Sequence, residues 1–369
     1  MNLLKNINTH ILLIFLLVIV PVYIYKDSFI SKMDMLVYGD RYAHSQYILG
    51  DAYTRQISDA DLYIYAGFSY ANGEDPTTIN FEHPPLAKYL LGISQLLFNN
   101  SLYLYLFIYV GVLYLFYKIS DRILKHDYSK YLSLVILGTL PLLTQFINKP
   151  VLDIPLMFLI FWFFLELTSK AKSLVYKYSI IGIIIGLIMS IKYPIPFILI
   201  PFGIVLIYSI LEKNIKHYIL VPMYSFLIYI GQYFMYFYHN HSIIDFINFE
   251  KYRFSWWFAD RTAPKFLIFK SLLFGKHEAW WDPNIDLTYY SDWSVLLPLI
   301  FILSILLLPW ISKKKILIYS YAFSILAFIG FAVGSGSSLR YLLITIPFWL
   351  LALISSVENI LSNFKKQSS

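Results

Sequence analysis

Residues 293–311 read WSVLLPLIFILSILLLPWI and residues 316–333 read ILIYSYAFSILAFIGFAV, with the four residues SKKK between them. Each run approaches the roughly 20 apolar residues that a helix needs to cross the hydrocarbon core of a bilayer. The lysines of the short connection indicate a cytoplasmic turn, because short cytoplasmic loops are enriched in Lys and Arg. This stretch therefore predicts two consecutive transmembrane helices.

The composition of the chain agrees with this pattern. Of 369 residues, 59% are hydrophobic and 14% are charged, and the mean hydropathy is +0.63. Soluble domains carry roughly 25% charged residues, so the composition excludes a soluble globular enzyme. The Lys and Arg residues are scattered between apolar runs rather than clustered on one face, which excludes a nucleic-acid partner. Cys is absent, so the chain has no disulfide and no thiolate metal site.

We expect an all-α polytopic membrane protein with about ten transmembrane helices in a single domain, residues 1–369. The predicted spans lie near residues 10–25, 101–117, 131–148, 154–167, 178–191, 197–211, 218–238, 293–311, 316–333 and 341–357. Residues 86–98 are also apolar, but about 13 residues are too few for a span. They predict an interfacial or re-entrant helix.

The distribution of charge predicts the orientation. With ten spans, one set of short loops and both termini carries fifteen Lys and Arg residues against five Asp and Glu residues. Because positive charge marks the cytoplasmic side, both termini should be cytoplasmic. Two long loops, residues 26–100 and 239–291, should then be extracytoplasmic, and we expect interfacial helices within them.

The first long loop contains two motifs. Residues 59–66 read DADLYIYA and residues 80–88 read NFEHPPLAK. Together they resemble the signature of the GT-C glycosyltransferases that use lipid-phosphate sugars, especially the membrane core of protein O-mannosyltransferases and their prokaryotic relatives. In that family an early Asp precedes a His-Pro-Pro-Leu-x-Lys element. The Asp is usually followed by Glu, whereas this chain has Ala60 there.

The resemblance implies roles for residues of both motifs. Asp59 is the expected catalytic residue, because the family places an aromatic residue four positions later, as Tyr63 is here. Asp61 is the alternative catalytic residue. Glu82, His83 and Lys88 are the expected substrate-binding residues of the second motif.

Three later segments extend the resemblance. Asp153 in VLDIPL resembles a second acidic motif, and Lys192 follows a Gly-containing helix as in the family. Arg340 and Tyr341 resemble a late Arg-Tyr element. All four are expected to bind substrate. The predicted topology places Asp59, His83, Asp153, Lys192 and Arg340 at the outer membrane boundary, where ionisable groups are candidates for function.

The resemblance implies an inverting glycosyltransferase that moves a sugar, with mannose as the expected one, from a polyprenyl or dolichyl phosphate to an extracytoplasmic hydroxyl. A glycan, a lipid or a protein would supply that hydroxyl. Such a transfer needs a base for the proton of the hydroxyl and cations for the departing phosphate. Asp59 is the candidate base, and Arg340 with Lys192 would bind the phosphate. We expect no cofactor and no metal ion.

Other interpretations remain open. The rival class is a membrane transporter or lipid flippase, which would place charged residues near span midpoints rather than at one boundary. His239 and His241, with Asp245 nearby, suggest a metal site, but no third ligand can be identified from the sequence. The protein should reside in the cell membrane, or in the endoplasmic reticulum membrane of a eukaryote, with membrane lipids as its surroundings.

Overall fold

The computed structural model describes residues 9–171, 173–192, 196–258, 265–277, 288–334 and 338–367. The regular secondary structure of the described residues is helical, except for one antiparallel pair of two-residue strands, β1 (Lys276–His277) and β2 (Thr288–Tyr289). The all-α prediction is therefore confirmed.

The α-helices are α1 (Thr9–Ile24), α2 (Lys26–Ile30), α3 (Met35–Ala43), α4 (Gln46–Leu49), α5 (Asp59–Ala71), α6 (Leu86–Phe98), α7 (Leu102–Ile123), α8 (Asp127–Thr139), α9 (Pro141–Thr144), α10 (Asp153–Leu167), α11 (Leu174–Met189), α12 (Pro196–Leu211), α13 (Leu220–Gly231), α14 (Phe234–Tyr238), α15 (Ile243–Phe258), α16 (Leu267–Phe274), α17 (Leu296–Leu306), α18 (Lys315–Val333) and α19 (Ile346–Gln367). Short 3₁₀ helices are η2 (Gly50–Ala52), η3 (Gln145–Ile147), η4 (Ile215–His217), η5 (Leu308–Trp310) and η6 (Leu339–Ile344).

Each of the ten apolar runs contains a helix, but the helices differ in length. By length and composition, α7, α18 and α19 can each cross a membrane, and α8 with the α9–η3 segment forms a bent pair, at 59°, that would make a fourth span. Pro141 explains that bend, because the residue before a proline is driven out of the helical conformation. The remaining apolar helices are shorter than a full span. The chain is a multi-pass membrane protein.

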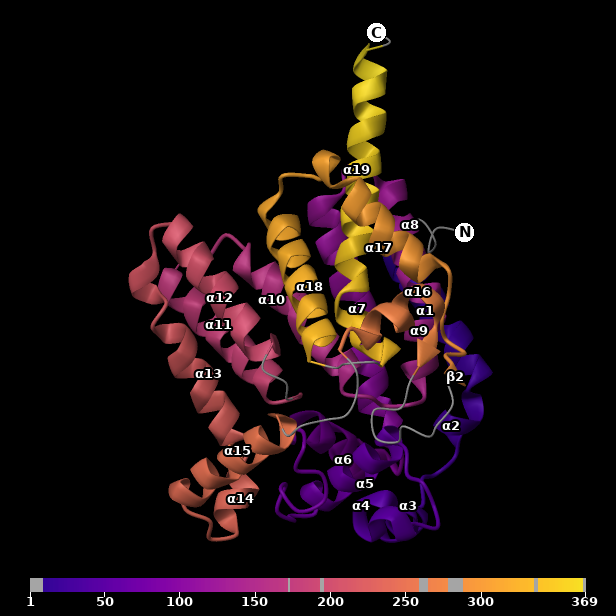
Figure 1. Ribbon diagram of the computed structural model, residues 1–369, viewed down its shortest axis with the longest axis vertical. Coiled ribbons are helices and arrows are strands. Elements are labelled where there is room, and N and C mark those ends of the chain that lie inside the picture. Colours follow the sequence, from indigo (N-terminus) through magenta and orange to yellow (C-terminus); the bar gives the residue numbers. More distant parts are fainter. Residues whose placement is uncertain are drawn as a thin grey trace, which may run out of the picture.

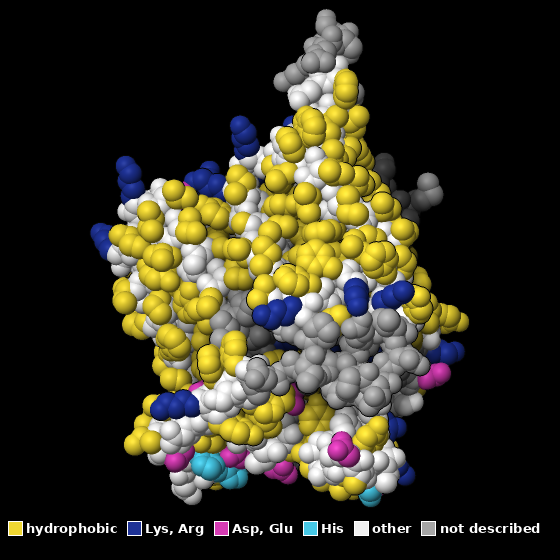
Figure 2. Space-filling model, in the orientation of Figure 1, with side chains coloured by type: hydrophobic (Ala, Val, Ile, Leu, Met, Phe, Trp, Pro, Cys, Tyr) yellow, Lys and Arg dark blue, Asp and Glu magenta, His cyan; other side chains and the backbone are white. Residues whose placement is uncertain are grey.

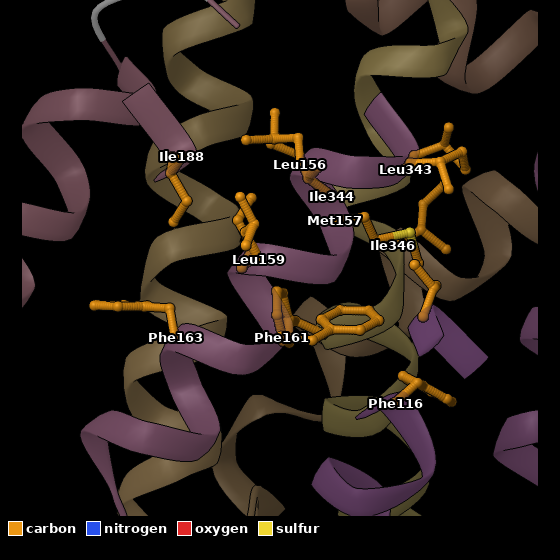
Figure 3. Close-up of a cluster of buried hydrophobic side chains, with 14 of the residues drawn as sticks. Phe116, Leu156, Met157, Leu159, Phe161, Phe163, Ile188, Leu343, Ile344 and Ile346 are labelled. Atoms are coloured by element: carbon orange, nitrogen blue, oxygen red, sulfur yellow. The ribbon is translucent and has the colours of Figure 1, made fainter. Parts of the chain in front are cut away.

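The core of the bundle is built around α10. This helix packs against α7, α11 and η6, and it is apolar on every side, as expected for a helix enclosed by others. Figure 3 shows side chains of α10 meeting those of η6, α11 and α7. Leu156, Met157 and Phe161 are completely buried there. Asp153, the first residue of α10, is thus held in place by a rigid core.

One end of the molecule is a cap formed by α3–α6 and α14–α15. In Figure 1 these helices lie at the lower end, while α7, α10, α18 and α19 run along the long axis above them. Hydrophobic side chains cover most of the upper part in Figure 2, whereas Asp, Glu and His side chains gather at the lower end. Helices α3–α6 of the first predicted long loop and α15 of the second therefore lie together in the cap, whereas α16 of the second loop packs against α17 and α18.

Within the cap, α5 and α6 cross at two glycines. A Cβ on Gly67 would lie 2.1 Å from the carbonyl oxygen of Lys88, and one on Gly92 would lie 1.9 Å from the carbonyl oxygen of Gly67. The two backbones are consequently in direct contact, which only glycine permits at these positions. This crossing sets the start of α5, at Asp59, relative to the start of α6.

Candidate active site

Asp59 and Asp61 lie in the first turn of α5. Ser58 caps this helix, and its side-chain oxygen accepts a 3.2 Å hydrogen bond from the Asp61 amide. The N-terminus of a helix carries a partial positive charge that favours carboxylates. The local sequence Ser-Asp-Ala-Asp therefore starts the helix and fixes both carboxylates at its end.

The two carboxylates have different partners. Asp59 Oδ2 accepts a 2.5 Å hydrogen bond from Arg340 Nη2, which is 281 positions later in the chain. Asp61 Oδ2 instead accepts a 3.1 Å hydrogen bond from Arg41 Nη1 on α3. Asp59 thus faces a residue of the later motifs, and Asp61 faces α3 within the cap.

Asp153 joins the two basic residues of the later motifs. Lys192 Nζ donates a 2.5 Å hydrogen bond to Asp153 Oδ1, and Arg340 Nε lies 3.7 Å from Asp153 Oδ2. The side chains of Asp153 and Lys192 are each 3% exposed. Asp59, Arg340, Asp153 and Lys192 therefore form one continuous charged network, which we call the charged cluster.

Aromatic rings border the charged cluster. The ammonium of Lys192 lies 4.4 Å from the centre of the Tyr341 ring, and the guanidinium of Arg340 lies 5.8 Å from it. Tyr63 is one turn after Asp59 on α5 and is buried. Burial, together with the negative charge of Asp59, raises the pKa of Tyr63 well above its ordinary value. The Tyr63 hydroxyl is therefore neutral.

Burial opposes the charge of both cations, but the net pKa shifts of Lys192 and Arg340 have opposite directions. Burial lowers the pKa of Lys192 to about 8, although Asp153 acts in the opposite direction. Burial also opposes the charge on Arg340, but Asp59 and its neighbours outweigh it and raise the pKa. Arg340 thus stays a cation at any accessible pH. Lys192, in contrast, loses its charge under mildly alkaline conditions.

His83 lies beside the charged cluster in a buried aromatic setting. Its ring is 5.3 Å from that of Trp257 and 6.3 Å from that of Tyr63, and the residue is 6% exposed. Among the described residues, its Nδ1 has no hydrogen-bond partner. Burial and the nearby positive charges of Lys192 and Lys88 lower the pKa of His83 well below its ordinary value. The imidazole is therefore neutral.

Lys88 points into the loop that carries His83. Its ammonium donates to the backbone oxygen of Asn80 at 2.7 Å, to the Asn80 side-chain oxygen at 3.0 Å and to the backbone oxygen of His83 at 2.7 Å. The residue is completely buried. All three donor positions of the ammonium are occupied by this loop. The geometry therefore assigns Lys88 to ordering residues 80–83.

Glu82 lies on the same loop, and α15 contacts it. Trp257 Nε1 donates a 2.9 Å hydrogen bond to the backbone oxygen of Glu82. Burial raises the pKa of Tyr47 on α4, and the negative charges of Glu82 and Asp59 raise it further. Tyr47 therefore lies within the electrostatic reach of both Glu82 and Asp59.

The structure brings some of the predicted residues together and separates others. The charged cluster brings together Asp59, Asp153, Lys192 and Arg340. Tyr341 borders it, and His83 and Glu82 lie beside it. Asp61 and Lys88 are bound by other partners. Tyr47 and Arg41 were not among the residues predicted from the sequence, and Trp257 was considered only as part of an aromatic-rich loop. The aromatic-rich loop around Trp257 was a detectable signal, but its composition equally fits a membrane-interface belt.

The histidines of the second loop contact the first loop. His241 Nε2 lies 2.9 Å from Asp75 Oδ2, and His239 Nε2 lies 2.7 Å from the backbone oxygen of Gly73. Asp245 instead binds Ser242. Among the described residues, no three His, Cys, Asp or Glu side chains are grouped as metal ligands. The geometry assigns these histidines to holding the two loops together.

Comparison with solved structures identifies the architecture. The crystal structure of ArnT from Cupriavidus metallidurans bound to undecaprenyl phosphate superposes with a TM-score of 0.57 over 93% of this chain, at 15% sequence identity. The apo structure of the same ArnT gives a TM-score of 0.53 over 82% of this chain, at 13% identity. This chain spans 59% and 55% of those two chains, respectively. No protein-family model matches the sequence, and neither does any curated protein.

The similarity to ArnT lies in the arrangement of helices rather than in the sequence. It extends over 93% of this chain. ArnT, which holds undecaprenyl phosphate in one of these structures, has the GT-C fold. The chain described here has the GT-C fold.

Proposed function

We propose that this protein is a GT-C glycosyltransferase that moves a sugar from a polyprenyl phosphate to a hydroxyl acceptor. The observation that carries the proposal is the charged cluster, where the partly exposed carboxylate of Asp59 contacts Arg340, and the buried Asp153 lies beside both Arg340 and Lys192. A base and a phosphate-binding pair are the groups that this transfer requires. The cluster lies where the bundle of apolar helices ends, and a lipid-linked donor would present its phosphate at that level.

Each residue of the charged cluster has a place in the proposed reaction. Asp59, whose side chain is 35% exposed, accepts the proton of the acceptor hydroxyl. The hydroxyl oxygen forms a bond to the anomeric carbon, while the bond from that carbon to the phosphate oxygen breaks. The electron pair stays on the phosphate, which Arg340 and Lys192 stabilise. A single displacement of this kind inverts the anomeric configuration.

The donor is the best supported part of the proposal. ArnT has been crystallised with undecaprenyl phosphate, and the shared fold favours a polyprenyl phosphate in this protein too. Mannose on dolichyl phosphate is the donor that the sequence resemblance favours. The charge distribution favours cytoplasmic termini and an extracytoplasmic site. The proposal includes no cofactor.

The test is a transfer assay with purified protein in nanodiscs and a panel of labelled polyprenyl-phosphate sugars. Wild-type protein should transfer or hydrolytically release one of these sugars. Asp59→Asn should lower the rate by roughly 10²- to 10⁴-fold, the usual contribution of a general base. Asp61→Asn is the matched control and should change the rate little. Movement of labelled lipid across the bilayer without any transfer would instead favour a flippase.

A further inference from the structure

The cations of the charged cluster are already paired with carboxylates of the protein. Arg340 donates to Asp59 Oδ2 and lies 3.7 Å from Asp153 Oδ2, while Lys192 donates to Asp153 Oδ1. Two carboxylates thus balance two cations. A donor phosphate brings another negative charge into this neutral set, so it must compete with one of the carboxylates.

The two carboxylates differ in how easily a phosphate can displace them from the cations. The Asp153 side chain is 3% exposed and contacts both cations, so separating it would leave a buried charge without a partner. The Asp59 side chain is 35% exposed and contacts Arg340 alone among these two cations. Water can therefore solvate Asp59 when it leaves Arg340, and Asp59 is the exchangeable partner.

We propose that the donor phosphate displaces Asp59 from Arg340, and that this exchange releases Asp59 to act as the base. This inference rests on the proposed function and adds a binding order to it. In the absence of donor, Asp59 Oδ2 is occupied by the hydrogen bond from Arg340 and is not free to accept the proton of a hydroxyl. The Arg340–Asp59 pair therefore keeps the site inactive until the donor is bound.

The movement of charge during the reaction agrees with this exchange. The acceptor hydroxyl gives its proton to Asp59, which becomes neutral, and the departing phosphate gains the corresponding negative charge. Arg340 contacts the phosphate in that step, so the cation stays with the group that becomes more negative. After the product leaves, Asp59 loses its proton to water and binds Arg340 again.

The exchange makes a prediction that a simple base would not make. If Asp59 competes with the phosphate for Arg340, its removal must strengthen phosphate binding, because the two equilibria are linked. Asp59→Asn and Asp59→Ala should therefore bind undecaprenyl phosphate more tightly than wild type, by about 5-fold or more, the lower end of the usual range for coupled sites. Both variants should nevertheless transfer sugar poorly.

The experiment is a binding titration of nanodisc-embedded protein with undecaprenyl phosphate, combined with a double-mutant cycle. Asp61→Asn removes a carboxylate two residues away that is paired with Arg41, and it should leave the affinity unchanged. Arg340→Ala should weaken binding. In the Arg340→Ala background, Asp59→Asn should no longer strengthen binding, because the two residues act through one contact.

Three results would overturn the exchange. In the first, wild-type protein binds undecaprenyl phosphate, and both Asp59 variants bind it no more tightly than wild type does. A second is a gain in affinity that persists without Arg340, which would show plain repulsion between Asp59 and the phosphate. The third is a wild-type protein that neither binds the lipid phosphate nor transfers sugar, and this result alone also removes the proposed function.

Discussion

Lys192 and Asp153 are paired at 2.5 Å with each side chain 3% exposed. Two ionic groups so deeply buried stabilise each other, but each is costly when the other is missing. Asp153 comes from the start of α10 and Lys192 follows α11. The pair therefore connects two core helices at the level of the charged cluster.

The first prediction concerns this pair and thermal stability. Asp153→Ala should destabilise the protein by about 3 kcal/mol or more, because it leaves the Lys192 ammonium buried and unpaired. The double variant Asp153→Ala with Lys192→Met should regain most of that stability but no transfer activity. Thermal unfolding in detergent, followed by tryptophan fluorescence, checks this. A double variant less stable than Asp153→Ala would contradict it.

The second prediction concerns pH. Burial lowers the pKa of Lys192 to about 8, so the ammonium loses its proton as the pH rises through that value. The cationic form is the one that can bind phosphate, and kcat/KM should therefore fall above about pH 8. Lys192→Arg keeps its charge over this whole range and should remove the alkaline decline. A decline that is identical in wild type and Lys192→Arg would assign it to another group.

The third prediction separates two roles for Lys88. If Lys88 orders the loop through its three hydrogen bonds, Lys88→Met leaves buried carbonyl oxygens unsatisfied and should lower the unfolding temperature. Activity should fall with it, because the loop carries Glu82 and His83. The sequence resemblance predicts substrate binding instead. In that case Lys88→Met would weaken binding of undecaprenyl phosphate without a change in unfolding temperature.

The fourth prediction concerns the orientation in the membrane. The chain has no native Cys, so single cysteines can be labelled without background. Thr54→Cys, exposed in the cap, should react with an impermeant thiol reagent added outside intact cells. Lys170→Cys, exposed between α10 and α11, should react only after the membrane is opened. Labelling of Thr54→Cys from the cytoplasmic side alone would reverse the proposed topology.

Parts of the fold follow directly from the sequence. The helix over residues 86–98 has the predicted bounds, because Pro84 and Pro85 precede it and Asn99 ends it in a left-handed conformation. Each of the ten apolar runs also contains a helix. Continuity of the spans does not follow from hydropathy, because the 59° bend near Pro141 comes from one proline that barely changes the hydropathy of the run.

The sequence by itself determined the class of protein and the residue types available for the chemistry. Apolar content and helix-length runs are local properties, so a membrane-embedded helical bundle could be read from them, and the motifs named the charged residues. Tertiary structure decided which of these residues are partners. Arg340 meets Asp59 across 281 positions, and Lys88 binds its own loop, because packing of α5, α6, α10 and η6 sets those distances. Local patterns carry no information on such distances.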